Sequence, residues 1–230
     1  MFMGHYGPSF ALRRAASRIS LGWLFVAAQL LDYLWALFVL VGVERAQVIP
    51  WQPGSRLDLY YMPFTHSLEG ALAWSILAGV VALWSVRGTE HDRVSAAMVV
   101  GLTVFSHWIL DAIVHRPDLG LLGDARKIGL SLYDHPLASA LLEAAILVGG
   151  AAIYARETRS RSGRRDTRLI AFIAILIVVN VIATFGPPPP SVRVAALFNL
   201  TVYTLAALAA FVIDRDRTVI DEPTAPERLP

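Results

Sequence analysis

Six stretches of about 20 mostly apolar residues alternate with short polar segments along the 230-residue chain. An apolar helix of that length crosses the hydrocarbon core of a bilayer. The predicted spans are residues 21–43, 68–86, 94–114, 136–155, 169–185 and 194–213. The first span contains Asp32, is too long for a cleavable signal peptide and lacks a small-residue cleavage site. The pattern predicts an all-α fold, a polytopic membrane helix bundle with about six transmembrane helices.

The composition supports a membrane protein and sets the domain organisation. Hydrophobic residues make up 56% of the chain and charged residues 17%, whereas soluble domains are about 25% charged. We expect residues 1–213 to form a single transmembrane domain. Residues 214–230 are charged and rich in proline, which is typical of disorder, so we expect a disordered cytoplasmic tail there.

The charges also predict an orientation and exclude several function classes. Fourteen of the twenty basic residues lie before the first span, in the loops after the second and fourth spans, or in the tail. The positive-inside rule then places both basic termini in the cytoplasm. The chain has no cysteine, which excludes thiol catalysis and cysteine metal sites. A net charge of +2 gives no indication of nucleic-acid binding.

Ionisable residues occur within or beside four of the spans, where each costs roughly 2.5–3.5 kcal/mol on insertion scales. They are Asp32 in the first span, His66 and Glu69 at the start of the second, His107, Asp111 and His115 in the third, His135 before the fourth and Glu143 within it. With the predicted orientation, most of these side chains lie in the outer half of the bilayer. Such residues need a partner or a function.

His107, Asp111 and His115 are spaced four residues apart, so they share one face of a helix. Imidazole and carboxylate ligands together suit Zn²⁺ or another divalent first-row metal. The alternative is that each is a hydrogen-bonded polar group between helices. We favour a metal site because Asp32, His66 and Glu143 are predicted at a similar depth.

His5 precedes the first span and allows two interpretations. If residues 9–17 form a short helix and the chain turns near residue 18, the N-terminus is re-entrant and His5 reaches the depth of Asp32. Otherwise the segment is an amphipathic helix at the interface, with His5 in water. Spacing alone gives these two interpretations equal weight.

The motifs around these residues resemble those of a bacterial family, the membrane-bound metal-dependent hydrolases, also described as LexA-binding, inner-membrane-associated hydrolases. The resemblance rests on Gly4-His5-Tyr6-Gly7, Thr65-His66-Ser67-Leu68, Ser106-His107-Trp108-Ile109-Leu110-Asp111, His115-Arg116-Pro117-Asp118-Leu119 and Leu142-Glu143. It implies a location in the bacterial inner membrane and a metal-dependent hydrolase activity.

The order of the candidate ligands is also similar to that of the zinc phospholipase C and single-strand nuclease superfamily. That likeness implies two or three zinc ions held by His5, Asp32, His66, His107, Asp111, His115, His135 and Glu143. The superfamily places its last His and Glu one helical turn apart, whereas His135 and Glu143 are eight residues apart here. Its ligating N-terminal amine has no expected counterpart, because the chain starts four residues before His5. A two-metal site is therefore the safer expectation.

In a hydrolase of this kind, Asp111 is the candidate general base. Glu69, one helical turn after His66, is a candidate to orient that histidine, and its alternative is a solvated acid at a helix N-terminus. Arg116 is a candidate to bind a phosphate oxygen of the substrate, and its alternative is an interfacial arginine paired with Asp118. The predicted depth suggests membrane lipid as a partner and a lipid or lipid-linked phosphoester as substrate.

Two other functions remain open. A divalent-cation or proton transporter also needs His and Asp inside the membrane, and it commonly shows inverted repeats, which this sequence lacks. A non-catalytic scaffold stabilised by metal would have every metal position filled by protein. The sequence contains no HExxH, GxSxG or P-loop motif. It gives no indication of oligomeric state.

Overall fold

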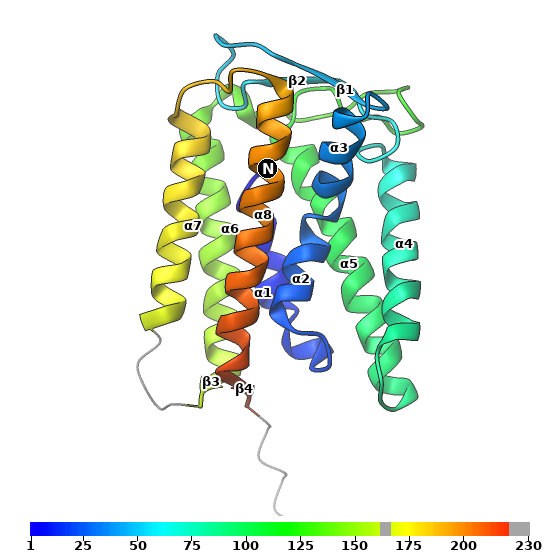
Figure 1. The fold of residues 1–230 in the computed structure, drawn as a ribbon, viewed down its shortest axis with the longest axis vertical. Coiled ribbons are helices and arrows are strands. Elements are labelled where there is room, and N and C mark those ends of the chain that lie inside the picture. The colour runs from blue at the N-terminus through cyan, green and yellow to red at the C-terminus, as the bar shows by residue number, and fades with distance from the viewer. Residues whose placement is uncertain (162–166, 221–230) are drawn as a thin grey trace, which may run out of the picture.

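The computed structural model describes residues 1–161 and 167–220. Over these residues it confirms the predicted all-α membrane bundle, with the helices running roughly parallel to one axis (Figure 1). The long helices are α4 (Leu68–Ser85), α5 (Glu90–Val114), α6 (Pro136–Glu157), α7 (Thr167–Phe185) and α8 (Val192–Arg215). Each of these five is long and apolar enough to cross a membrane.

The first predicted span is not one continuous helix. It divides into α2 (Leu21–Ala28) and α3 (Leu30–Leu40), which meet at Gln29 with a bend of 51°. Gln29 is fully buried, and its side-chain amide donates to the Phe2 carbonyl. The hydrophobic pattern does not reveal this break because apolar residues continue on both sides of it.

The N-terminal segment is re-entrant. Helix α1 (Tyr6–Ala11) and a 3₁₀ turn (Arg14–Ala16) run down inside the bundle, and the chain then reverses into α2 (Figure 1). Helix α1 packs against α2, α5 and α6, and His5 and Tyr6 are completely buried. Of the two interpretations of the N-terminus, the structure therefore has the inserted one.

A glycine pair brings α1 against α6. A Cβ built on Gly150 would lie 2.2 Å from the Gly7 carbonyl oxygen, which real Cβ atoms do not tolerate. Aromatic side chains pack around this contact, with the rings of Tyr6 and Phe25 stacked at 4.0 Å. The small residues thus let two backbones approach closely, as is common in membrane helix packing.

A buried ion pair fixes the base of the hairpin. The Arg13 guanidinium donates to both oxygens of Asp214 at the end of α8, at 3.0–3.1 Å. The same carboxylate accepts from the backbone N–H of Leu21 and the hydroxyl of Tyr154. Three segments that are distant in sequence therefore meet at Asp214.

Loops and two short pairs of β-strands cover the two ends of the bundle. At the end nearer the N-terminus lie the antiparallel pair β1 (Arg45–Val48) and β2 (Leu57–Tyr61), a loop over residues 115–135 that contains the 3₁₀ turn Leu132–Asp134, and the turn at 186–191 (Figure 1). At the opposite end β3 (Thr158–Ser160) pairs with β4 (Arg217–Val219). Part of the predicted tail is therefore structured, since residues 214–219 end α8 and form β4. Residues 221–230 lie outside the described residues.

Candidate metal centre

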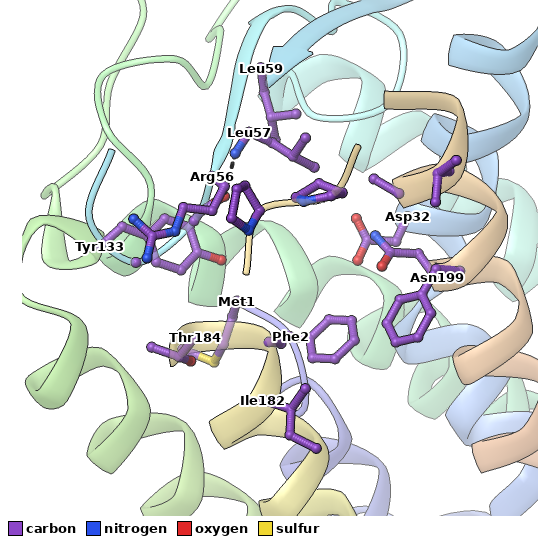
Figure 2. Close-up of a pocket in the computed structure, with 18 of the residues that line it drawn as sticks. Met1, Phe2, Asp32, Arg56, Leu57, Leu59, Tyr133, Ile182, Thr184 and Asn199 are labelled. Atoms are coloured by element: carbon purple, nitrogen blue, oxygen red, sulfur yellow. Dashed lines mark hydrogen bonds between the residues drawn. The ribbon is translucent and has the colours of Figure 1, made fainter. Parts of the chain in front are cut away.

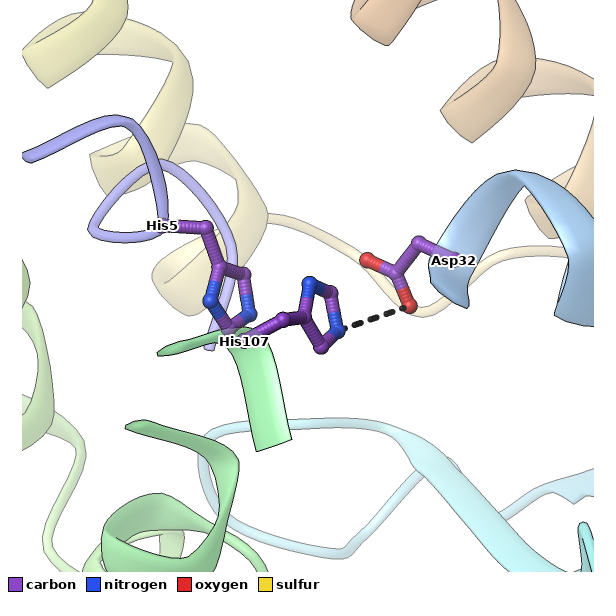
Figure 3. Close-up of side chains that lie close together, drawn as sticks. All are labelled: His5, Asp32 and His107. Atoms are coloured by element: carbon purple, nitrogen blue, oxygen red, sulfur yellow. Dashed lines mark ion pairs between the residues drawn. The ribbon is translucent and has the colours of Figure 1, made fainter. Parts of the chain in front are cut away.

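Six candidate ligands from four separate parts of the chain converge in the bundle. His5 precedes α1, Asp32 lies in the first turn of α3, His66 comes just before α4, and His107, Asp111 and His115 lie in or directly after α5. The His5 and His107 rings stack at 3.6 Å, and the Asp32 carboxylate approaches His107 from the other side (Figure 3). All six side chains are buried or nearly so.

The Nδ1 atom of His107 is fixed by a backbone carbonyl. It lies 2.6 Å from the Ala28 oxygen, at the point where α2 ends. A carbonyl oxygen only accepts, so Nδ1 carries a proton, and Nε2 is the nitrogen that the neutral ring would offer to a metal. The break in the first span thus supplies the acceptor that orients this histidine.

His66 is oriented by a two-step relay. The Thr65 hydroxyl donates to the buried carboxylate of Glu44 at 2.7 Å, and it lies 2.7 Å from Nδ1 of His66. Because the hydroxyl proton goes to Glu44, Nδ1 of His66 donates to the hydroxyl oxygen. The Nε2 lone pair of His66 is therefore free.

His115 has the same arrangement with another partner. Its Nδ1 lies 2.9 Å from Oδ1 of Asp118, so it donates to that carboxylate. Hydrogen bonds from Nδ1 to a carbonyl, hydroxyl or carboxylate are the usual way in which proteins orient metal-binding histidines. Three histidines thus present Nε2 in the state that binds metal.

The Asp111 carboxylate joins two groups of ligand atoms. Its Oδ2 atom lies 3.1 Å from Nε2 of His107 and 3.6 Å from Nε2 of His66. Oδ1 of Asp32 completes this first group, at 3.7 Å from His107 and 3.3 Å from His66. The Tyr203 hydroxyl donates to the other oxygen of Asp32 at 2.7 Å, which fixes the direction of that carboxylate.

The second group surrounds the other oxygen of Asp111. Nε2 of His5 lies 3.1 Å and Nε2 of His115 lies 3.6 Å from Oδ1. The α-amino group of Met1 also contacts this oxygen. Ligand atoms of His5, Asp32 and His107 also lie within 4.8 Å of one another, so the two groups are adjacent.

These separations fit ligands around a metal ion. Bonds of about 2.0–2.2 Å to a tetrahedral ion separate its ligand atoms by about 3.3–3.6 Å, whereas a direct hydrogen bond between imidazolium and carboxylate is about 2.7–2.9 Å long. The observed range of 3.1–3.7 Å lies nearer the first value. Both nitrogens of His5 and Nε2 of His107 are buried without a hydrogen-bond partner among the described residues. The donor set therefore fits divalent metal, and the buried His/Asp groups could hold one.

Glu143 lies beside the second group. Its Oε2 atom accepts from the backbone N–H groups of Phe2 and Gly4, at 2.8 and 3.2 Å, and so holds the N-terminal segment in place. The carboxylate also lines a pocket of about 410 Å³ together with Asp32, His115 and Tyr133. The Tyr133 hydroxyl and the Asp32 carboxylate point into this space from opposite sides (Figure 2). Burial raises the pKa of Tyr133 well above its usual value, so its side chain is a neutral phenol.

The structure does not bring all the predicted site residues together. His135 is exposed before α6, and no contact with the cluster is found for it among the described residues. Glu69 is exposed and accepts from the Gly123 N–H at 2.6 Å, so Glu44 and Thr65 orient His66 in its place. The geometric reason is that Glu69 lies on α4, past the turn that presents His66.

Arg116 and Asp111 also differ from their predicted roles. Arg116 binds Asp134 and the Pro53 carbonyl, at 2.9 and 2.8 Å, and does not line the pocket. Its predicted alternative partner, Asp118, holds His115 instead. Both oxygens of Asp111 face ligand nitrogens, so its geometry fits a bridging ligand better than a general base.

Several residues that orient the candidate ligands were not predicted from the sequence. Thr65 and Asp118 lie within the quoted motifs, next to or near a histidine, so a search for histidine partners could have found them. Glu44 and Tyr203 had no local signal, because their partners are 21 and 171 residues away.

Comparisons of the chain with protein-family models, curated proteins and solved structures found no match. The interpretation of the site therefore rests on its own geometry.

Proposed function

We propose that the protein is a membrane-embedded hydrolase that uses two divalent metal ions, with zinc the best-fitting metal, to cleave a phosphoester. The observation that carries the proposal is the Asp111 carboxylate, whose two oxygens each face a separate group of histidine nitrogens. Carboxylates commonly bridge the paired metals of hydrolytic sites, and imidazole with carboxylate suits zinc. The resemblance of the motifs to the bacterial metal-dependent membrane hydrolases agrees with this assignment.

The two groups would hold one ion each. Asp32, His66 and His107 with Oδ2 of Asp111 form the first set, and His5 and His115 with Oδ1 of Asp111 form the second. When bound, a metal pair of this kind activates water and stabilises the charged oxygens of an in-line displacement at phosphorus. Six histidine and aspartate side chains, from the re-entrant segment, α3, the turn before α4 and the C-terminal part of α5 with the residue that follows it, would thereby be held in one place before substrate arrives.

Residues that face the pocket would handle protons. The Glu143 carboxylate is buried beside the second group and is placed to accept the proton of the attacking water. The neutral Tyr133 phenol faces the same pocket and can donate a hydrogen bond to an oxygen of the substrate. Asp111 then remains a ligand throughout.

The location of the centre favours a substrate within the membrane. All the ligands lie in or next to helices that are apolar enough to span a bilayer. The positive-inside pattern favours an orientation in which the centre lies in the outer half of the membrane and the basic residues at the base of the N-terminal hairpin and at the end of α8 face the cytoplasm, and the family resemblance suggests the bacterial inner membrane. A lipid or lipid-linked phosphoester is the substrate class that reaches this depth.

Hydrolysis is favoured over transport and over a purely structural role. A transporter needs a polar path to both sides, whereas the aromatic core around Tyr6 and Phe25 and the Arg13–Asp214 pair lie between the cluster and the opposite end of the bundle. A structural metal site is closed by protein ligands, whereas Asp32, His115 and Glu143 line an open pocket.

The test is metal content and phosphoesterase activity of the detergent-purified protein. We expect about two zinc ions per chain by inductively coupled plasma mass spectrometry, and hydrolysis of bis(p-nitrophenyl) phosphate or p-nitrophenyl phosphate. H66A should lose most of the metal and the activity, whereas H91A, which changes an exposed histidine in the first turn of α5, should keep both. Equal metal content in H66A and H91A would contradict the metal site, and metal-loaded protein without phosphoesterase activity would contradict the hydrolase.

A further inference from the structure

The pocket beside the metal centre has two chemically different ends. At one end lie Asp32, His115 and Glu143. At the other end the wall is formed by Ile182 of α7, by Val194 and Phe198 of α8, and by the prolines that join these helices. Its volume of about 410 Å³ is in the range of small-molecule sites. The pocket thus connects polar groups to an apolar wall.

The apolar end continues onto the outer surface of the bundle. Ile182, Val194 and Phe198 are 58%, 46% and 52% exposed, and they lie on two of the most apolar helices of the structure. In a bilayer such side chains face hydrocarbon. The pocket wall and the lipid-facing surface are therefore one continuous apolar face.

The turn between α7 and α8 suits this position. Residues 187–190 are four consecutive prolines, and all of them line the pocket. Proline has no backbone N–H, so this segment brings no unsatisfied donors next to hydrocarbon. A hydrocarbon chain can lie against the turn without displacing a hydrogen bond to N–H.

Arg56 supplies a cation near the polar end. It lines the pocket beside Tyr133 (Figure 2). Its Nη1 atom is held by the carbonyls of Pro50 and Gln52, but its Nε atom is buried without a hydrogen-bond partner among the described residues. A buried donor on a fixed guanidinium is costly unless a ligand satisfies it. Guanidinium groups match the geometry of phosphate oxygens.

We propose that the pocket binds a phospholipid, with its phosphate between Arg56 and the metal centre and one hydrocarbon chain leaving between α7 and α8. This inference rests on the proposed function and names its substrate class and entry route. Arg56 would then bind the phosphate oxygen of the substrate, which is the role predicted from the sequence for Arg116. Substrate then enters sideways from the membrane and need not cross the capping loops.

Lipid binding and metal chemistry can be measured separately, which separates the two proposals. Native mass spectrometry of the zinc-loaded, detergent-purified protein would report binding of phosphatidic acid, phosphatidylglycerol and, as an uncharged control, diacylglycerol. The phosphate-bearing lipids should bind at least tenfold more tightly than diacylglycerol. R56Q should remove this preference and R56K should restore part of it, whereas R45Q, on the exposed strand β1, should behave as wild type.

A second pair of variants tests the apolar route. F198W should obstruct the pocket and weaken phospholipid binding at least tenfold, while zinc content remains at the wild-type level. L205W, two turns further along α8 and 60% exposed outside the pocket, is the matched control. Unchanged phospholipid binding in both R56Q and F198W would overturn this inference and leave the hydrolase proposal intact. Absence of zinc or of soluble phosphoesterase activity in wild type would instead overturn the hydrolase proposal.

Discussion

At the scale of single residues, the orientation of the histidines depends on groups that bind no metal themselves. Glu44 is almost completely buried and accepts three hydrogen bonds, two from backbone N–H groups and one from the Thr65 hydroxyl. Its carboxylate therefore determines which way the Thr65 hydroxyl points, and through it the tautomer of His66. Groups of this kind contribute to metal affinity without touching the ion.

Replacing Thr65 by valine is expected to lower zinc affinity by about 10–100-fold, the usual effect of losing an orienting partner of a metal ligand. Valine has nearly the same shape but gives Nδ1 of His66 no acceptor. Competition with a fluorescent zinc chelator measures the affinity. T89V is the control. Thr89 caps the N-terminus of α5, away from the metal centre, so this variant should keep wild-type affinity. Equal affinities for T65V and T89V would contradict the relay.

The bridging position of Asp111 makes a second residue-scale prediction. D111N should reduce zinc to well below one ion per chain, because both ligand groups lose their shared carboxylate. D32N should leave one ion, because Asp32 pairs with His66 and His107 of the first group. Zinc stoichiometry by mass spectrometry distinguishes the two variants. The same loss of metal in both would argue against two separate positions.

At the scale of elements, the re-entrant hairpin determines whether the centre is complete. It carries His5 and Met1, and it is held by backbone contact with α6 and by the Arg13–Asp214 pair at its base. Breaking a buried pair of this kind costs about 3–5 kcal/mol because one charge is left uncompensated. The hairpin is therefore held by α6 near its N-terminal end and by α8 at its turn.

Gly149 and Gly150 offer a matched test of the α1–α6 contact. The Cβ of G150A would lie 2.2 Å from the Gly7 carbonyl oxygen, so α1 must move. Overpacking of this kind typically costs about 1–3 kcal/mol, and the displaced hairpin should also weaken zinc binding. For G149A nothing lies within 4 Å of the added Cβ, so thermal stability should not fall. Thermal unfolding in detergent measures both variants, and equal melting temperatures would contradict the close approach.

At the scale of the whole molecule, metal binding should contribute to the stability of the bundle. Asp32 and Asp111 come from separate helices and both lie within 3.6 Å of Nε2 of His66, so two negative charges share a buried site and need positive charge to balance them. A ligand present at 100 times its dissociation constant stabilises the folded state by about 2.7 kcal/mol. Bound metal would thus link α3 and α5 to the N-terminal hairpin.

Removing zinc with EDTA should lower the melting temperature of the wild-type protein by several degrees, and added zinc should restore it. H107A, which has lost a ligand of the first group, should start lower and respond to EDTA much less. Differential scanning fluorimetry in detergent measures both. A wild-type melting temperature that does not depend on EDTA would show that no metal stabilises the fold.

The sequence by itself determined the helical spans and most of the residues of the buried His/Asp groups. Five predicted spans correspond to α4–α8 because crossing a bilayer requires long apolar helices, and that requirement is local and visible in composition. Asp32, His66, His107 and Asp111 stood out for a related reason, since ionisable groups are costly at those depths, whereas His5 was indicated only by the resemblance of its motif.

Only the tertiary structure decided how these residues are used. The bend at Gln29, the insertion of the hairpin, and the partnerships of Glu44 and Tyr203 depend on contacts between segments up to 171 residues apart. Arg116 and Glu69 were assigned because they lie one and three residues after a histidine, but a side chain so close in sequence to a ligand can point to another loop, as both do. Spacing along a helix fixes which face a residue occupies, whereas the packing of the other helices fixes what that face meets.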